Sequence, residues 1–408
     1  MSAIRRRFDF LYPLAIAGIV SLAWLYLILW VQLIGVQRLR TTTDFVAFYA
    51  AGRIAQTEGA GQVYNLQSQR AVEEVVVGHT FQADEVNPFV HPPFVIPLLE
   101  HVIQPDYIAA YQSWALVMSA FFVVSAACLV ISLPRLLKRD AIILLAVLIL
   151  FFPGMVSILN GQDSAILLLG GAIWLYGLLK RKDRLAGLGL ALTIIRPQIS
   201  LALALPFLFK RRLVWWWYCV GFSFLAAVSL LVMGPEGIRS YFGILTVSAS
   251  GEGYLIHEWA MVNLLGLLRN IFLNISAVAL RDISWVFFLA AIVGLCLLWA
   301  RSKLILERHI GLAVILSVFA SPHLHYHDLV LLLLPLAGSM RLALQRDSLC
   351  AASLAPILSA LSFLLLINHM VALPHVAPYL LMLALVLWLW YSDRLIKLFK
   401  RKHVGLLE

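Results

Sequence analysis

Residues 11–36 read LYPLAIAGIVSLAWLYLILWVQLIGV, and residues 41–49, which follow shortly after, read TTTDFVAFY. The first run carries no charge and exceeds the roughly 20 apolar residues that a helix needs to cross a bilayer. It is too long for a signal peptide and lacks a small-residue cleavage site, so we predict a retained membrane anchor. Asp44 lies where this helix emerges. Its carboxylate is either the cap of a following helix or a base directed at a membrane-borne substrate.

The whole chain has the composition of an all-α polytopic membrane protein. Its 408 residues are 62% hydrophobic and 13% charged, whereas a soluble domain is about 45–50% apolar and about 25% charged. The net charge of +10 comes from short basic clusters between apolar runs. This is the positive-inside pattern and not a nucleic-acid surface. The four cysteines lie far apart in apolar runs, which indicates small buried side chains and not disulfides or metal ligands.

The basic clusters predict twelve crossings with both termini in the cytoplasm. If the N-terminal arginines are cytoplasmic, all eight lysines fall on the inner side and nine of the eleven histidines on the outer side. The lysine bias sets the orientation, and the histidine bias indicates chemistry or polar packing at the outer face. The predicted crossings are 11–36, 107–133, 141–159, 164–179, two short helices within 185–209, 214–233, 283–300, two short helices meeting at 321–328, 349–372 and 376–393.

We treat residues 1–408 as a single membrane domain, with 1–240 as the N-terminal catalytic module and 241–408 as the helices that complete a substrate groove. The first outer loop, 38–106, is too long for a simple connector, and such loops are usually functional. We predict amphipathic helices over 44–58 and 66–77 within it.

A second outer segment, 234–282, is predicted to hold a short amphipathic piece around 262–275. His257 and Glu258 precede that piece and are candidates for contact with a polar ligand.

Polar residues break the two pairs of short helices. Arg196 lies in Ile195-Arg196-Pro197-Gln198, where the proline separates two apolar helices. An arginine in such surroundings must reach the interface or meet an anion. Its guanidinium suits the oxygens of a phosphate, and a structural ion pair is the alternative.

The second pair of short helices meets at a turn that carries His323, His325, His327 and Asp328. Alternate residues share a side only in an extended chain, and no cysteine or glutamate joins them. This pattern favours polar contacts to a ligand, or a satisfied structural cluster, over a metal site.

Two further turns carry polar residues at the outer face. His91-Pro92-Pro93-Phe94 is either a helix-start signal or a rigid wall of an outer cavity. Asn160-Gly161-Gln162-Asp163 joins two predicted crossings. It is either a tight turn whose Asp163 or Ser164 caps the next helix, or part of a binding site.

Taken in order, several motifs resemble the polyprenyl-phosphate-sugar-dependent glycosyltransferases of family 87, which have a GT-C fold. The resemblance runs from about residue 40 to residue 340. The motifs are Thr43-Asp44-Phe45-x-x-Phe48-Tyr49-x-Ala51-Gly52, Val63-Tyr64-Asn65, His91-Pro92-Pro93-Phe94, Gly161-Gln162, Ile195-Arg196-Pro197-Gln198, and Ser321-Pro322 with the histidines that follow. Members often have lysine where Arg196 stands and tyrosine where His91 stands.

The resemblance implies an inverting enzyme of the cell envelope. Such an enzyme transfers mannose or arabinose from a lipid-phosphate carrier to a lipid or glycan acceptor, at the outer face of the cytoplasmic membrane and without a metal cofactor. Asp44 would be the catalytic base. Arg196, His323, His325, His327, Gln162 and Asn160 would contact the donor, and Tyr49, Tyr64, His91, His257 and Glu258 would line the acceptor cavity.

Two other classes remain open from the sequence. Twelve spans with broken helices suit a transporter or a flippase of lipid-linked sugars, although the two halves show no repeat and the first outer loop is long for a carrier. A non-catalytic membrane subunit fits if Asp44 is only a helix cap.

Overall fold

The computed structural model describes residues 11–35, 41, 43–82, 85–134, 136–250, 258–303, 307–345, 351–371 and 376–404. Side chains at 247–250, 351–353 and 392–404 are not included. Within these residues the secondary structure consists of helices with irregular connections, which confirms the predicted all-α membrane fold.

Five helical segments are long and apolar enough to cross a membrane, and a sixth is gained if one bent pair counts as a span. The bent pair is α8 (Lys138–Ile149) and α9 (Phe152–Leu159), which meet at 47°. The five are α2 (Leu11–Gly35), α7 (Tyr107–Ser132), α13 over Arg212–Thr246, α15 (Ala277–Arg301), and η6 (Tyr326–Leu332) with α17 (Leu333–Gln345).

The remaining predicted crossings correspond to shorter helices, so length alone does not test the count of twelve. These helices are α10 (Ser164–Leu179), α11 (Asp183–Leu192), α12 (Pro197–Ala204), α16 (Glu307–Ala320), α18 (Ala351–Met370), and α19 (Val376–Val404).

The helix breaks at the two polar turns are confirmed. Arg196 has φ −123° and ψ 88°, because a residue before proline is excluded from helical geometry. Pro197 then opens α12, where its missing N–H costs nothing. His325 is likewise non-helical, with an extended backbone between α16 and η6.

We expected the helix from 214 to end at 233, with a polar outer segment beginning at 234. The helix does break there, because α13 (Arg212–Ser250) consists of two helices that meet in a kink at the non-helical Gly234, which has φ 66° and ψ 174°. The outer segment differs from the expectation in that it begins with a second helix. Glycine alone tolerates that backbone conformation, and Pro235 then starts the next turns as a first-turn proline. The continuation reaches the first loop, where the rings of Tyr241 and Tyr64 lie 5.0 Å apart.

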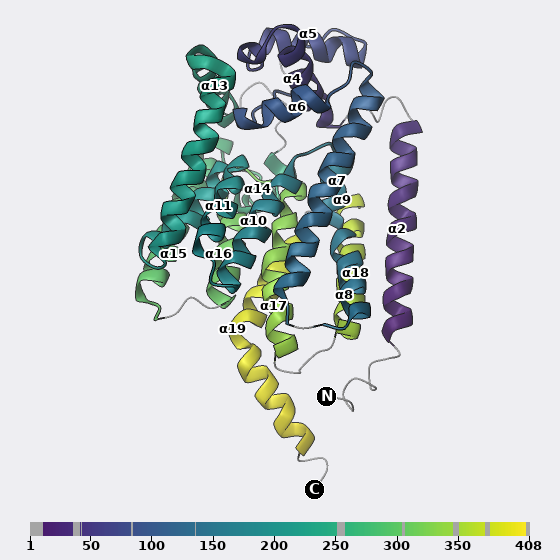
Figure 1. Cartoon of the computed structure of the whole chain (residues 1–408), viewed down its shortest axis with the longest axis vertical. Helices are drawn as coiled ribbons and strands as arrows, with labels where there is room; N and C mark the ends of the chain where they lie inside the picture. The colour runs from purple at the N-terminus through teal and green to yellow at the C-terminus, as the bar shows by residue number, and fades with distance from the viewer. Residues whose placement is uncertain are drawn as a thin grey trace.

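Residues 43–106, here called the loop module, form a layer at one end of the helix bundle, opposite the end where α2 begins (Figure 1). The module contains α4 (Phe45–Thr57), η1 (Ala60–Gln62), α5 (Leu66–Val77), η2 (Pro93–Val95) and α6 (Ile96–Val102). The predicted helices at 44–58 and 66–77 are therefore confirmed. In the second outer segment, α14 (Leu264–Ile271) confirms the predicted amphipathic piece.

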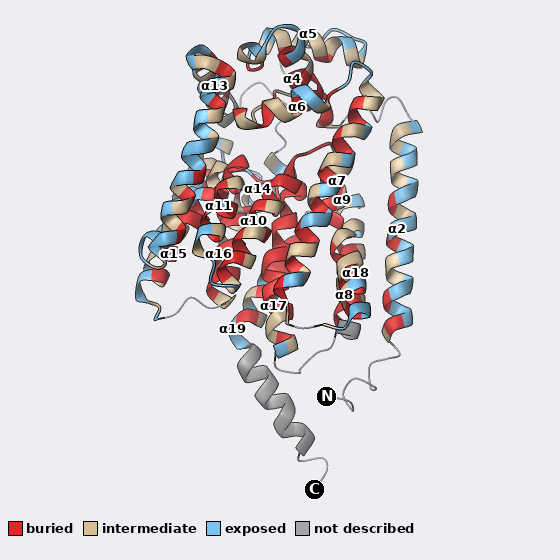
Figure 2. Cartoon of the chain, viewed as in Figure 1, coloured by how far each residue is buried: buried red, intermediate tan, exposed pale blue. Residues whose placement is uncertain are grey.

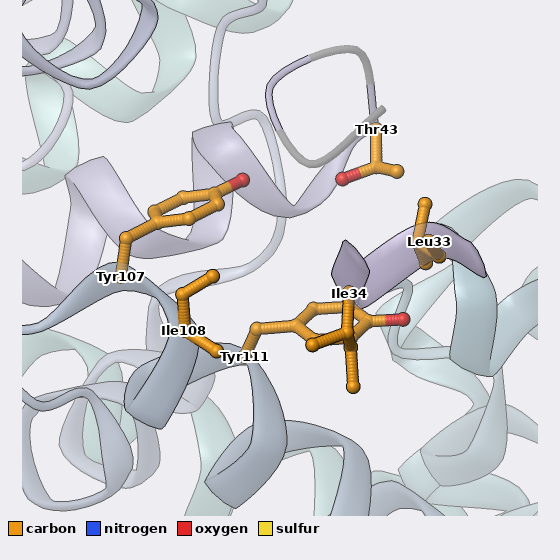
Figure 3. A pocket seen from close by; sticks show the side chains of 6 residues that line it. All are labelled: Leu33, Ile34, Thr43, Tyr107, Ile108 and Tyr111. Carbon is orange, nitrogen blue, oxygen red and sulfur yellow. The ribbon is translucent and has the colours of Figure 1, made fainter. Parts of the chain in front are cut away.

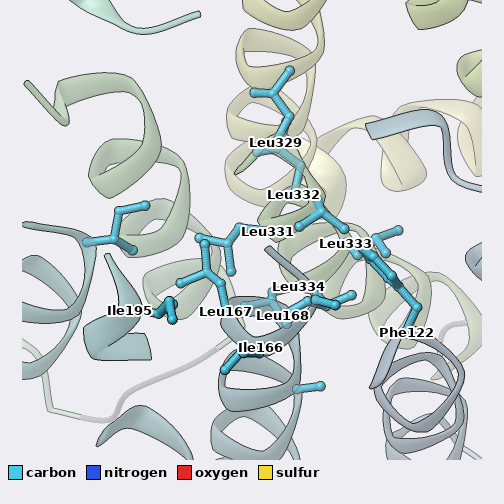
Figure 4. Close-up of a cluster of buried hydrophobic side chains, with 14 of the residues drawn as sticks. Phe122, Ile166, Leu167, Leu168, Ile195, Leu329, Leu331, Leu332, Leu333 and Leu334 are labelled. Carbon is cyan, nitrogen blue, oxygen red and sulfur yellow. The ribbon is translucent and has the colours of Figure 1, made fainter. Parts of the chain in front are cut away.

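The buried side chains concentrate along the middle of the bundle, and α2 at its edge is mostly exposed (Figure 2). Exposed apolar side chains on α2, such as Leu14 and Trp24, suit contact with lipid. In the centre, α10 packs against η6 and α17 through leucines that include Leu167, Leu331 and Leu334 (Figure 4). Gly171 permits this approach, because an added Cβ would lie 2.7 Å from a methyl of Leu334.

Candidate functional site

Four segments far apart in the sequence meet in one hydrogen-bonded cluster. They are the start of α4, the turn between α9 and α10, the turn before α12, and the turn between α16 and η6. The cluster contains Asp44, Gln162, Asp163, Arg196 and Asp328. The two short-helix turns meet, since Arg196 contacts Asp328, and Gln198 donates to the carbonyl of His323 over 3.0 Å.

Asp44 precedes α4 but does not cap it. Its side chain makes no capping hydrogen bond. Gln162 Nε2 instead donates to Asp44 Oδ2 over 2.8 Å, and Asn87 Nδ2 lies 3.5 Å from Oδ1. The carboxylate is half-buried, and no arginine or lysine within the described residues pairs with it. Asp44 is therefore an ionisable group held by neutral amides and still partly accessible.

The turn that carries Gln162 depends on Gly161. This residue has φ +70°, and an added Cβ would lie 2.4 Å from the Cβ of Phe45. Trp114 Nε1 on α7 donates to the Gly161 carbonyl over 2.8 Å. The absence of a side chain at 161 thus lets the turn approach the start of α4, which brings Gln162 to Asp44.

Arg196 lies between two buried carboxylates. Its Nε lies 3.1 Å from Oδ2 and 3.2 Å from Oδ1 of Asp328, and its NH1 lies 3.0 Å from Asp163 Oδ1. Ser164 also donates to Asp328, over 2.8 Å. Each of the three charged side chains is at most 10% exposed. The geometry favours the structural ion pair over a free arginine, because both acids already compensate its charge.

His91 joins this cluster through Asp163. Its Nδ1 lies 2.7 Å from Asp163 Oδ2. The same Nδ1 lies 3.1 Å from Arg196 NH1. The carboxylate can only accept a hydrogen bond from Nδ1 and the guanidinium can only donate one to it, so the tautomer of His91 decides which of the two contacts is a hydrogen bond. Tyr64 donates its hydroxyl to the His91 carbonyl and is itself buried. Tyr64 therefore supports the turn that begins at His91.

In the histidine turn, the ring of His325 lies next to the rings of both His323 and His327. The rings of His323 and His325 lie 4.8 Å apart, and those of His325 and His327 lie 5.9 Å apart. His323 is exposed and His325 half-buried. His327 is buried, with Nε2 3.7 Å from Asp328 Oδ2. His323 and His325 are thus the two that a ligand can reach.

The other predicted site residues are placed less directly. Tyr49 is buried and donates its hydroxyl to the Pro105 carbonyl over 2.6 Å. Asn160 ends α9 two residues before Gln162. The carboxylate of Glu258 pairs with Arg281 at 2.7 Å and Arg269 at 3.2 Å, which occupies both its oxygens. His257 lies outside the described residues.

A small pocket lies beside the start of α4, between the end of α2 and the start of α7 (Figure 3). Its lining is mainly apolar, with the hydroxyl-bearing Thr43, the neighbour of Asp44, at one side. The lining residues are Leu33, Ile34, Thr43, Tyr107, Ile108 and Tyr111.

Asp163 and Asp328 were not among the residues predicted to form the site. Asp163 was placed in a polar turn between two crossings and Asp328 in the histidine turn, and neither was assigned a role of its own. Both carried the signal that revealed Arg196, an ionisable residue beside long apolar helices. Asn87 carried no such signal, since an asparagine before a proline in a loop is common.

The fold and the site define the class of this protein. It is a polytopic, all-helical membrane protein with a half-buried acid beside a buried acid–arginine cluster. A model of glycosyltransferase family 87 matches residues 89–322, more than half of the chain. The chain belongs to this family and is a membrane glycosyltransferase. A search of curated proteins and a search of solved structures found no match.

The matched span includes His91, Asp163 and Arg196. Asp44 precedes it, and the histidine turn and Asp328 follow it. The roles of those residues therefore rest on their geometry.

Proposed function

We propose that the protein is an inverting transferase that moves a sugar, with mannose as our first choice and arabinofuranose as the alternative, from a polyprenyl-phosphate donor to a lipid or glycan acceptor. The reaction takes place at the outer face of the cytoplasmic membrane. Asp44 removes the proton of the acceptor hydroxyl as that oxygen attacks the anomeric carbon.

The observation that carries the assignment of the base is the difference between three neighbouring carboxylates. Asp163 and Asp328 are buried and committed to Arg196, whereas Asp44 is half-buried and bonded to amides. A base must be reachable and must have a lone pair to spare. Asp44 meets both conditions, because Gln162 and Asn87 leave other acceptor sites on its two oxygens free.

The donor phosphate fits the histidine turn. His323 and His325 are reachable, and imidazole N–H groups can bind the oxygens of a leaving phosphate. We assign Arg196 a supporting role behind them, because a direct contact with phosphate would require it to leave one of its two carboxylates. In this mechanism no metal ion is required.

The position of the loop module supports an outer location. It contributes Asp44 and His91 to the site, and it lies at the end of the bundle opposite the start of α2 (Figure 1). The first basic cluster, Arg5 to Arg7, precedes α2. An inward N-terminus therefore puts the loop module and the site outside.

The test is product analysis with purified protein. Synthetic polyprenyl-phosphate mannose and its arabinose analogue are each incubated with membrane-lipid acceptors, with and without chelator. We expect one donor to give a glycosylated lipid of inverted anomeric configuration, at equal rate in chelator. No product from either donor, together with uptake of donor into proteoliposomes, would overturn the proposal in favour of a flippase. Activity lost in chelator and restored by a divalent ion would overturn its metal-free form.

A further inference from the structure

A segment without helix or strand, beside the site, is held by side chains. Residues 85–90 adopt no helix. Glu73 Oε2 accepts from the backbone N–H of Asn87 over 3.0 Å, and Gln69 Oε1 accepts from that of Phe89 over 2.8 Å. Tyr64 donates to the carbonyl of His91.

The spacing of these contacts resembles a sheet edge. Residues 87, 89 and 91 alternate along the chain, and in an extended backbone alternate residues direct their N–H and C=O groups to the same edge. Pro88, between the first two, has no N–H to satisfy. Gln69 and Glu73 lie four positions apart on α5, so they share one face of that helix. Both are fully buried.

These hydrogen bonds to residues 87, 89 and 91, here called the ladder, determine where two residues of the site lie. Asn87 turns its amide to Asp44 at 3.5 Å, and His91 places Nδ1 against Asp163. Between them, the ring of Phe89 packs 5.5 Å from that of Phe48 on α4. The separation between the Asp44 side and the Asp163 side of the cluster therefore depends on contacts made by α5.

Glu73 is an unusual member of this ladder. Its Oε1 is buried without a hydrogen-bond partner, and its Oε2 has the single backbone donor. No lysine or arginine in the described part of the chain pairs with it. On α5 itself, Arg70 pairs with Glu74 at 2.8 Å, and on α4 Arg53 donates to Gln56 over 2.7 Å. On α7, Tyr107 interacts electrostatically with Glu73. Asp44 lies on the far side of Asn87, whose amide it contacts.

We propose that Gln69 and Glu73 are positioning residues for the transferase site, and that Glu73 does this as a neutral carboxylic acid whose ionisation releases the 87–91 segment. The proposal rests on the assignment of Asp44 as the base. A buried carboxylate with one N–H donor and no cation is strongly disfavoured. The neutral acid keeps its carbonyl oxygen for Asn87, whereas the anion draws water towards the buried face of α5.

The pH at which this occurs follows from burial. Desolvation raises the pKa of Glu73 to about 8, and the hydrogen bond from Asn87 opposes this only in part. The native state therefore holds a proton that the unfolded chain releases near its ordinary pKa of 4.5. The contribution of Glu73 to stability is full below that value and is lost as pH rises through about 8.

The test is Glu73→Gln, which keeps an acceptor for Asn87 N–H but cannot ionise. The first readout is the ratio of transfer rates at pH 9 and pH 7. One pH unit above a pKa leaves about a tenth of a group protonated, so we expect about a tenfold fall in the wild type. We expect little fall in Glu73→Gln. Glu74→Gln, next to it on α5 but paired with Arg70, is the matched control and should keep the wild-type ratio.

A second readout does not depend on activity. The melting temperature of the wild type should fall between pH 6 and pH 9 relative to that of Glu73→Gln, and the amides of Asn87 and Phe89 should lose protection from hydrogen exchange in the same range. If no transfer is detected at all, this readout still decides the role of Glu73. Parallel melting curves and parallel rate profiles for wild type and Glu73→Gln would overturn the proposal, as would wild-type protection of both amides at pH 9.

Discussion

Three carboxylates lie in one cluster of this protein, and their partners decide what each can do. Asp163 and Asp328 bind the same guanidinium and are almost inaccessible. Asp44 binds side-chain amides and is partly accessible. Removing one partner of a buried pair leaves an uncompensated charge, whereas the partners of Asp44 are neutral. In the proposed mechanism Asp44 is therefore the acid that takes part in the chemistry, and Asp163 and Asp328 are the acids that hold the cluster together.

Asp44→Asn tests the assignment of the base. The amide oxygen still accepts from Gln162, so we expect the melting temperature to stay close to that of the wild type. Transfer should fall by at least about 100-fold, because positioned general bases contribute about 10²–10⁴-fold. The measurement is product formation by mass spectrometry on purified protein. A rate near that of the wild type would remove Asp44 from the chemistry.

Arg196→Ala separates a structural arginine from a phosphate ligand. It leaves Asp163 and Asp328 buried without their cation, which costs about 3–5 kcal/mol. We therefore expect a large fall in melting temperature as well as lost transfer. The double variant Arg196→Met with Asp328→Asn should recover part of the stability, because it removes a buried charge of each sign. A wild-type melting temperature for Arg196→Ala, combined with weak donor binding, would instead make Arg196 the phosphate ligand.

At the scale of the element, short helices place polar turns where a full span would be apolar. Pro153 follows the bend between α8 and α9, and Pro197 opens α12. Within a membrane, irregular backbone is tolerated only where it is buried in protein or lines a cavity. Here Trp114 satisfies the carbonyl of Gly161, and Gln198 that of His323. The breaks therefore create the site, and neighbouring side chains satisfy their backbone groups.

Gly161→Ala tests the turn that brings Gln162 to Asp44. The left-handed backbone costs about 1–2 kcal/mol for a residue with a Cβ, and the overpacked contact with Phe45 costs about 1–3 kcal/mol more. Gly78→Ala is the matched control, since Gly78 has φ +84° but open space around it. We expect both variants to lose stability, Gly161→Ala the more, and only Gly161→Ala to lose transfer. Equal losses in the two variants would show that the close approach to Phe45 has no role.

At the scale of the whole molecule, the site requires the loop module to sit on one end of the bundle. The loop module contributes Asp44 and His91, the α9–α10 turn contributes Asp163, and η6 contributes Asp328. The α13 helix extends past its kink to reach this layer and pairs Tyr241 with Tyr64 (Figure 1). The loop module is thereby held both by the cluster in the bundle and by the end of α13.

Single cysteines test the orientation. Gln82 and Lys182 are both exposed, the first in the loop module and the second in the basic turn after α10. In a background without the native cysteines, a membrane-impermeant maleimide added outside should label Gln82→Cys and not Lys182→Cys. Permeabilised cells provide the control, in which both should react. Labelling of Lys182→Cys in intact cells would invert the topology and place the site inside.

The sequence by itself determined the membrane class, most of the helix boundaries, and several residues of the site. Apolar length and proline position act locally, so 66–77, 164–179 and the break at Arg196 were predicted as they occur. Asp44 was also found locally, because it follows the first long apolar run. The break at Gly234 was predicted too, but the helix that follows it was not, because the residues from 234 were expected to form a polar outer segment.

Only the tertiary structure decided which charges neutralise one another. Asp328 is 132 residues from Arg196 in sequence, and His91 is 105 residues away from it. No local pattern states which acid an arginine meets across a bundle. The role of Glu73 was also hidden from the sequence. There it is only one polar residue of an amphipathic helix, and its burial follows from the packing of α5 against residues 87–91. Burial and partners are properties of the packed molecule, and they determine which of several identical side chains carries a charge, holds a segment, or is free to react.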